Sequence, residues 1–270
     1  MSLLIRTWNL FHGDVVPPER RSYLPEMIAL ATRDDPDVVC LQEVPPWALS
    51  HLDTWSGMEV FPAIAARPTI GPLPSTAELG RRLSRVDPGR LRSLFTGQAN
   101  VVLLAPRHRG EPAGELVLNA WRFRRAQTQT LGLDLVTRLA WAKERRVAHA
   151  VRVRFEGGDG GVVTNFHATG SHDKRLPDAE VRRAAWFAEA ISEPHEISVL
   201  AGDFNVRAAI SRTLPDLCDP EWGYSQPGPG IDHVLVRGVE ATPGRPWKLS
   251  ARQLDRRLLS DHAPVDVMIT

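Results

Sequence analysis

The feature that most constrains this chain is a buried strand followed at once by polar side chains. Residues 197–200 form an apolar run, typical of a buried strand, and Ala201-Gly202-Asp203-Phe204-Asn205 comes directly after it. Because side chains alternate faces on an extended backbone, we expect Asp203 and Asn205 to point the same way. A carboxylate beside an amide suits a hard, oxygen-binding cation and the phosphate it carries. A plain polar turn after a core strand is the alternative that this segment alone does not exclude.

Length and composition indicate a globular protein. The 270 residues are enough to bury a substantial core, and we expect one domain over residues 1–270. A hydrophobic content of 43% and a net charge of +1 point to no particular partner. Cys40 and Cys218 have no disulfide or metal-ligand spacing, and no signal or membrane-spanning segment is evident. We therefore predict a cytoplasmic protein without stable membrane association.

Hydrophobic spacing predicts many strands and few helices. The predicted strands cover residues 3–9, 38–41, 100–104, 115–123, 147–155, 161–169, 197–200 and 231–236, with a final strand through Ile269. Helices are predicted over residues 17–32, 45–52 and 178–191. Residues 57–95, with the arginines Arg81, Arg82, Arg85, Arg90 and Arg92, and residues 127–146 show no clear class. This order indicates a layered α/β or α+β domain.

Several of these strands have acidic, amide or imidazole groups at or just beyond one end. Besides Asp203 and Asn205, they are Asn9, Glu43, His167, Asp232, Asp261 and His262. Carboxylates with an amide suit Mg²⁺ or Mn²⁺, and histidines act as acid or base near neutral pH. Taken singly, each residue has an ordinary structural role, such as a strand end, a helix cap, a core histidine or a turn. The functional interpretation therefore depends on the set and its order.

The set resembles a known superfamily. Thr7-Trp8-Asn9, Leu41-Gln42-Glu43, Asn165-Phe166-His167, Gly202-Asp203-Phe204-Asn205, Ile231-Asp232-His233 and Ser260-Asp261-His262 occur in the order of the endonuclease/exonuclease/phosphatase superfamily, which includes deoxyribonuclease I. The resemblance runs from residue 7 to residue 266. It implies an α+β fold, a four-layer α/β/β/α sandwich with the site at one end of two packed sheets.

The resemblance implies a Mg²⁺ (or Mn²⁺) site and a catalytic group. Glu43 resembles the principal metal carboxylate, with Asn9 and Asp261 beside it. Asp203 resembles the aspartate that orients or deprotonates the attacking water, and Asn205 the amide that holds phosphate and metal.

The two motif histidines complete this group. His262 would contact the scissile phosphate or act as base, with Asp232 hydrogen-bonded to its ring. His167 resembles the second histidine of the deoxyribonuclease and sphingomyelinase branches, an acid or transition-state stabiliser. Weaker matches suggest Asn100, Arg145 and Arg146 as substrate-binding residues.

We therefore expect metal-dependent hydrolysis of phosphodiester bonds, and we favour a nuclease that acts on DNA or RNA. Residues 81–154 hold sixteen Arg or Lys against five Asp or Glu, which would suit a nucleic-acid backbone. Trp121, Phe123 and Trp141 are candidate stacking groups. Arginines that merely face solvent are the plain alternative. Hydrolysis of a phospholipid or small phosphoester, and a catalytically inactive nucleic-acid-binding protein, are the alternative functions.

Overall fold

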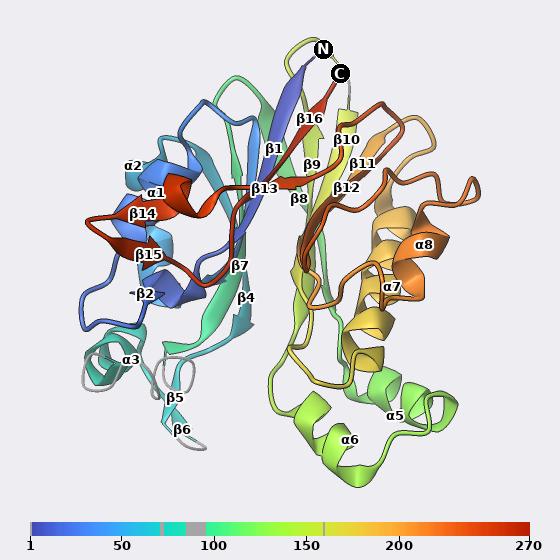
Figure 1. The fold of residues 1–270 in the computed structure, drawn as a ribbon, viewed down its shortest axis with the longest axis horizontal. Coiled ribbons are helices and arrows are strands. Elements are labelled where there is room, and N and C mark those ends of the chain that lie inside the picture. Colours follow the sequence, from blue (N-terminus) through green and yellow to red (C-terminus); the bar gives the residue numbers. More distant parts are fainter. Residues whose placement is uncertain (1, 71–72, 85–95, 159) are drawn as a thin grey trace.

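Two β-sheets form the centre of the protein, in a computed structural model that describes residues 2–70, 73–84, 96–158 and 160–270. The first sheet has the strand order β13 (Arg245–Pro246), β16 (Val265–Ile269), β1 (Leu3–Asn9), β3 (Val38–Val44), β7 (Gln98–Leu104) and β4 (Glu59–Ala66). The second has the order β12 (Asp232–Arg237), β11 (Ile197–Asp203), β10 (Gly160–His167), β9 (Val147–Arg154) and β8 (Arg109–Val117). The two sheets pack face to face along the middle of the molecule (Figure 1).

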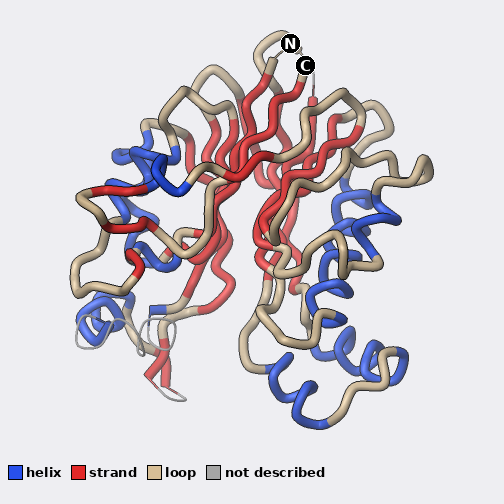
Figure 2. Tube along the Cα trace, viewed as in Figure 1, coloured by secondary structure: helices blue, strands red, loops and turns tan. Residues whose placement is uncertain are grey.

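Helices lie on the outer side of each sheet (Figure 2). Beside the first sheet are α1 (Leu24–Ala31), α2 (Leu52–Ser56) and α3 (Ala77–Ser84). Beside the second are α5 (Trp121–Thr130), α6 (Leu135–Ala142), α7 (Arg175–Ile191) and α8 (Thr213–Leu217). Short pieces complete the chain: the 3₁₀ turns Phe11–Gly13, Pro46–His51 and Leu249–Arg252, and the strands β2 (Val15–Val16), β5 (Thr69–Ile70), β6 (Leu73–Pro74), β14 (Gln253–Leu254) and β15 (Arg257–Leu259).

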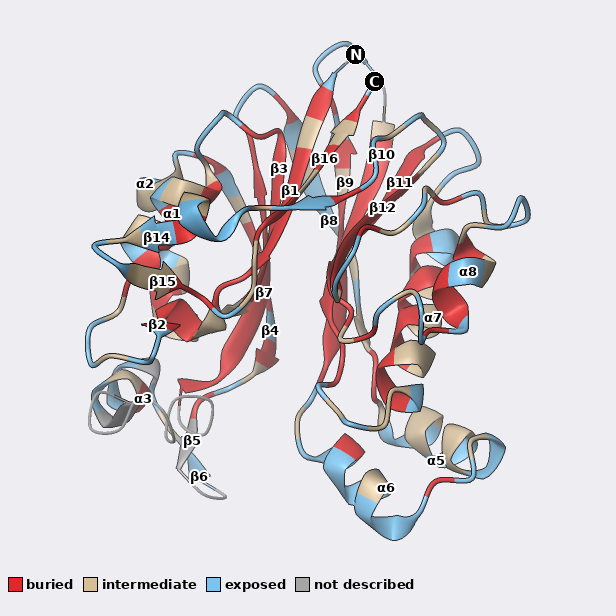
Figure 3. Cartoon of the chain, viewed as in Figure 1, coloured by how far each residue is buried: buried red, intermediate tan, exposed pale blue. Residues whose placement is uncertain are grey.

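Three apolar clusters hold the layers together. Between the sheets, side chains such as Ile5 and Val102 pack against Val163 and Val199. Outside the first sheet, the apolar face of α1 packs on β3, and outside the second, α7 packs on β10 and β11. Accordingly, both sheets are buried along most of their length, while the helices keep one exposed side (Figure 3). This arrangement confirms the four-layer α/β/β/α sandwich.

Most of the predicted helices and strands are confirmed, and the exceptions have clear physical causes. The strand predicted over residues 115–123 is wrong at both ends: β8 spans Arg109–Val117, and α5 begins at Trp121. Pairing with β9 makes a strand of residues 109–114 despite their glycines and proline. The helix predicted over residues 17–32 begins only at Leu24, and residues 127–146 contain helical segments of α5 and α6.

Arg85, Arg90 and Arg92 lie outside the described residues, whereas Arg81 and Arg82 pair with Glu78 on α3. Within the described ranges, no helix combines the length and the apolar character needed to traverse a bilayer.

A buried amide pair joins the two sheets close to the ends of β3 and β10. Gln42 Nε2 donates to Asn165 Oδ1 at 2.8 Å, and Asn165 Nδ2 donates to the carbonyls of Leu41 (3.0 Å) and Val101 (2.9 Å). Gln42 Nε2 also lies 3.1 Å from the hydroxyl of Thr7 on β1. Buried amides are costly unless bonded, so these bonds specify how one sheet sits on the other.

We expect Asn165→Leu to lower the free energy of unfolding by about 2 to 4 kcal/mol, because it leaves buried polar groups without their donor. Urea unfolding measures this change. Thr164→Val is the matched control: Thr164 is the preceding residue, and its buried hydroxyl has no partner among the described residues. A loss equal to that of the control would contradict the structural role of Asn165.

Candidate active site

Strand pairing in the second sheet brings three site residues together. His167 at the end of β10 is in register with Asp203 at the end of β11, and Asp203 is in register with Asp232 on β12. Close approach of β10 and β11 requires glycine at position 202. Gly202 has φ +142°, and a Cβ there would lie 1.9 Å from the carbonyl oxygen of Phe166. Gly202 therefore secures the register that aligns His167 with Asp203.

The carboxylate of Asp203 is the centre of the candidate site. Its Oδ2 accepts from Asn9 Nδ2 at 3.1 Å and lies 3.3 Å from His167 Nε2 and 3.7 Å from His262 Nε2. Its Oδ1 accepts from the backbone N–H of Asn205 at 2.9 Å. Asn9 comes from the first sheet and His167 from the second, so this buried carboxylate lies where the two sheets meet.

His262 reaches this centre from the loop before β16. Its Nδ1 lies 2.9 and 3.0 Å from the two carboxylate oxygens of Asp232. Its carbonyl accepts from Trp8 Nε1 (2.9 Å) and Arg252 Nη1 (2.8 Å), while the hydroxyl of Ser260 donates to the Asn9 carbonyl at 2.7 Å. These bonds hold the loop on β1 and leave Nε2 as the nitrogen that faces Asp203.

The site's charges are unevenly distributed. Burial disfavours the charged ring of His262, but the carboxylates of Asp203 and Asp232 outweigh this effect and raise its pKa to about 10. Burial raises the pKa of Asp203 to about 7, against the pull of the His262 cation. Burial and then the charge of Arg146 lower the pKa of His167 well below its ordinary value. At neutral pH this arrangement favours a charged His262 and a neutral His167.

Glu43 provides a second carboxylate, from the first sheet. The pairing of β3 with β7 is irregular between Leu41 and Val44, and Glu43 has φ +53°, a left-handed conformation. Its carboxylate lies 3.2 Å from His12 Nε2 and 3.9 Å from His167 Nε2. His12 was not predicted, because no motif marks it; its only signal is its place just after β1.

A pocket of about 300 Å³ opens over these groups. It is lined by Phe11, His12, Glu43, Gln98, Glu144, Arg146, His167, Gly170, Asp203, Asn205 and His262. Six predicted site residues therefore share one pocket, although they come from distant parts of the chain. Asn9 and Asp232 lie behind it, each bonded to a residue that lines it.

Three expectations about orientation need correction. Asn205 does not continue the strand: it has φ +52°, and its Nδ2 donates to the carbonyl of Ala168 at 3.0 Å. It reaches the pocket because the backbone turns, not because strand residues alternate. Asn100 is buried and donates to the Val147 carbonyl at 2.7 Å, and Arg145 donates to backbone carbonyls of β4. Neither Asn100 nor Arg145 lines the pocket. Because both side chains are bonded to backbone carbonyls, the prediction that they bind substrate is not supported.

The sequence pattern of the Endonuclease/Exonuclease/phosphatase family matches residues 7–262. The chain belongs to this family. No curated protein sequence matches the chain. Solved structures share its fold: a functionally unknown conserved protein from Enterococcus faecalis V583 (TM-score 0.68, 13% identity, 99% of each chain covered) and an endonuclease/exonuclease/phosphatase from Bacteroides vulgatus (0.66, 14%, 100% of this chain and 99% of that one). Another is humanized D. rerio TDP2 (0.60, 18%, 100% and 99%).

Membership in the Endonuclease/Exonuclease/phosphatase family supports a metal-dependent phosphoesterase.

The three aromatic residues that were predicted to stack on bases differ in how far they are exposed. Trp141 is fully buried and donates from Nε1 to the buried carboxylate of Glu180 at 2.5 Å, so its predicted stacking role is wrong. Phe123 packs edge-on against it, whereas Trp121 is 63% exposed.

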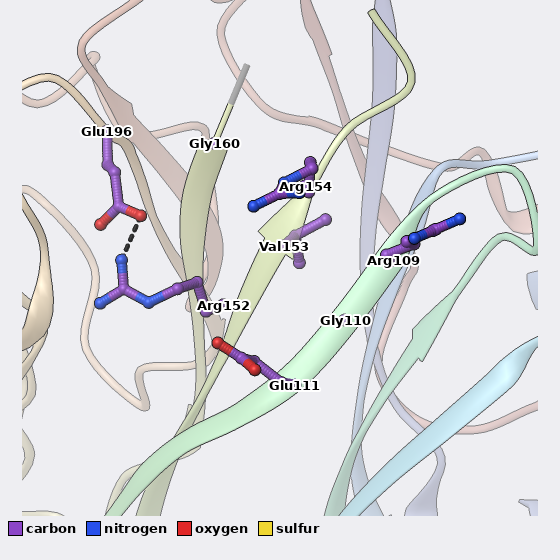
Figure 4. A pocket seen from close by; sticks show the side chains of 8 residues that line it. All are labelled: Arg109, Gly110, Glu111, Arg152, Val153, Arg154, Gly160 and Glu196. Carbon is purple, nitrogen blue, oxygen red and sulfur yellow. Dashed lines mark hydrogen bonds and ion pairs between the residues drawn. The ribbon is translucent and has the colours of Figure 1, made fainter. Parts of the chain in front are cut away.

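A second cavity lies at the opposite end of the second sheet, where β10 begins (Figure 4). Figure 4 shows Arg152 turned toward Glu196, with which it pairs, while Arg109 and Arg154 point elsewhere. None of the residues that line it belongs to the family motifs. The motif residues Glu43, His167, Asp203, Asn205 and His262 line the pocket over Asp203 instead.

We expect Asp232→Asn to lower the pKa of His262, because a neutral amide no longer stabilises the charged ring. The measurement is an NMR titration of the imidazole signals, with the exposed His195 as the internal reference. An unchanged His262 titration would show that Asp232 is not its electrostatic partner.

Proposed function

We propose that this protein hydrolyses phosphodiester bonds of nucleic acid with a divalent cation, Mg²⁺ or Mn²⁺. The observation that carries the proposal is the buried Asp203, which lies within 3.7 Å of both motif histidines and is bonded to Asn9. A carboxylate that is shared by two imidazoles at the floor of a pocket is an arrangement for moving protons. The family match supports the same class of chemistry.

The residues fit a hard cation. Glu43 and Asp261 are two carboxylates whose negative charges interact: desolvation, and then the Glu43 charge, raise the pKa of Asp261. We assign the cation to Glu43 and Asp261, whereas the predicted ligand Asn9 lies behind the pocket and its Oδ1 accepts from the backbone N–H of Phe11 at 3.0 Å. One possible ligand atom from each of Asp203, Asp232 and His262 also lies within 4.8 Å of the other two. However, Asp232 is bonded to His262 Nδ1, and both oxygens of Asp203 accept hydrogen bonds, from Asn9 and Asn205. When bound, the cation would neutralise phosphate charge and acidify water.

The remaining residues would act on water, phosphate and leaving group. Asp203 would orient and deprotonate the attacking water, and His262, held by Asp232, would contact the scissile phosphate through Nε2. His167 would stabilise the departing oxygen. Arg146 lies 3.0 and 3.2 Å from the two ring nitrogens of His167 and lines the pocket, where its guanidinium can bind phosphate oxygens.

A catalytically inactive binding protein is the less favoured function. Loss of catalysis would leave motif positions free to change, yet each predicted catalytic residue is present and hydrogen-bonded or ion-paired within the site.

We expect His262→Ala and Glu43→Ala each to lower kcat by about 10²-fold to 10⁴-fold, the usual effect of losing an acid–base or charge-stabilising group. The measurement is hydrolysis with Mg²⁺ or Mn²⁺ of plasmid DNA, single-stranded RNA, bis-p-nitrophenyl phosphate, p-nitrophenyl phosphate and sphingomyelin. EDTA should abolish it.

The control is His195→Ala, because His195 is exposed and remote from the pocket. Full activity of His262→Ala would contradict the assignment. Hydrolysis of sphingomyelin or p-nitrophenyl phosphate in place of nucleic acid would replace the nuclease by one of the alternative functions.

A further inference from the structure

A groove of about 530 Å³ lies between α5, α7 and the segment that follows β11. Its volume is in the range of sites that bind ligands, roughly 300–1,000 Å³. α5 and α7 lie together on the outer side of the second sheet (Figure 1). None of the family motifs contributes a residue to the groove.

The lining of the groove is cationic. It contains four arginines and one lysine but only one carboxylate, Asp178. Two of the arginines pair with acids outside the lining, Arg175 with Asp173 at 2.6 Å and Arg182 with Asp216. A positive surplus therefore remains inside the groove.

Three cations of the lining make no ion pair with a carboxylate in the part of the chain that the structure describes. Arg183 lies over the ring of Phe123, 4.3 Å from its centroid. Lys174 Nζ donates to the carbonyl of Asn205 at 3.0 Å, and Arg212 is exposed. Burial lowers the pKa of Arg183 although the nearby carboxylate of Glu180 acts in the opposite direction.

Large apolar side chains are exposed in the same groove. Trp186 is 59% exposed and Ile210 is 58% exposed. Trp186 makes a T-shaped contact with Trp222, with ring centroids 5.1 Å apart, which orients the indole. An oriented, exposed indole can stack on a base, and the neighbouring cations can bind the phosphate of the same nucleotide.

The groove adjoins the candidate active site. Lys174 lines the groove, and Asn205, whose carbonyl it binds, lines the pocket over Asp203. A ligand with its scissile phosphate at Asp203 can therefore continue past Lys174 toward Trp186.

We propose that this groove binds an unpaired nucleic-acid strand that extends from the scissile phosphodiester, with a base stacked on Trp186 and phosphates at Lys174, Arg183 and Arg212. The inference rests on the proposed nuclease function and adds that the substrate has a single-stranded segment. A duplex keeps its bases stacked on one another and leaves none for Trp186. A bilayer requires protruding apolar groups, whereas Trp186 and Ile210 line a hollow.

The test measures binding in EDTA, where no hydrolysis occurs. The probe is a fluorescein-labelled oligothymidylate of about twelve nucleotides, followed by anisotropy. We expect Trp186→Ala to raise its Kd about 5-fold to 100-fold, as loss of one stacked base does, and Trp186→Phe to restore part of the affinity. Arg212→Ala should reduce the slope of log Kd against log salt by about 0.7.

Matched controls come from other surfaces. Trp55 on α2, beside the first sheet, does not line the groove, and Arg154 lies at the far end of β9. Trp55→Ala and Arg154→Ala should bind as the unchanged protein does. Thermal unfolding checks that Trp186→Ala is folded, and the exposed Arg212 provides a variant that needs no repacking.

Each outcome decides the inference. Equal binding by all variants, equal losses in the controls, or tighter binding of a matched hairpin duplex or of phosphatidylserine vesicles overturns it. Hydrolysis of bis-p-nitrophenyl phosphate with Mg²⁺ separates the two proposals. If Trp186→Ala keeps this activity and loses the strand, both hold; if no variant hydrolyses the diester yet the groove still binds the strand, only the proposed function fails.

Discussion

The amide pair between Gln42 and Asn165 determines how the two sheets face each other, and the candidate site depends on that geometry. Apolar packing between sheets is non-directional, because valine and isoleucine side chains tolerate small shifts. The bonds from Asn165 to two carbonyls of the first sheet do not tolerate such shifts. Since Asn9 and Glu43 come from one sheet and His167 and Asp203 from the other, a shift between sheets would separate the groups of the site.

The contacts of Asp203 depend on this alignment of the two sheets. Its carboxylate is buried, and burial raises its pKa to about 7, whereas the hydrogen bonds from Asn9 and Asn205 favour its charged form. His262, which is brought from near the end of the chain and held by Trp8 and Arg252, provides the nearby positive charge. A carboxylate and an imidazole that shift each other's pKa in one pocket are typical of acid–base sites.

In the proposed function, two adjoining surfaces would divide the recognition of a substrate. The pocket over Asp203 holds the charged groups that can act on a phosphate, whereas the groove along α7 holds cations and an exposed indole. Lys174 connects them through its bond to Asn205. The arginine-rich character of residues 81–154 contributes less to this arrangement than composition suggests, because Arg145 and Arg152 are occupied by internal partners.

The sequence by itself determined the class of fold and named most of the polar residues that gather around Asp203. Apolar runs predicted β1, β3, β10 and β11 and a layered α/β or α+β domain, because strands are set by local patterns. The four-layer sandwich and the shared site of Asp203, His167 and His262 were implied by the resemblance of the ordered motifs to the superfamily. Only the tertiary structure decided which polar residues face the pocket. Asn100 and Arg145 bond to backbone, His12 approaches Glu43, and Asn205 reaches the pocket through a left-handed turn. The groove around Trp186 was likewise invisible, because its residues come from three separate segments that only folding brings together.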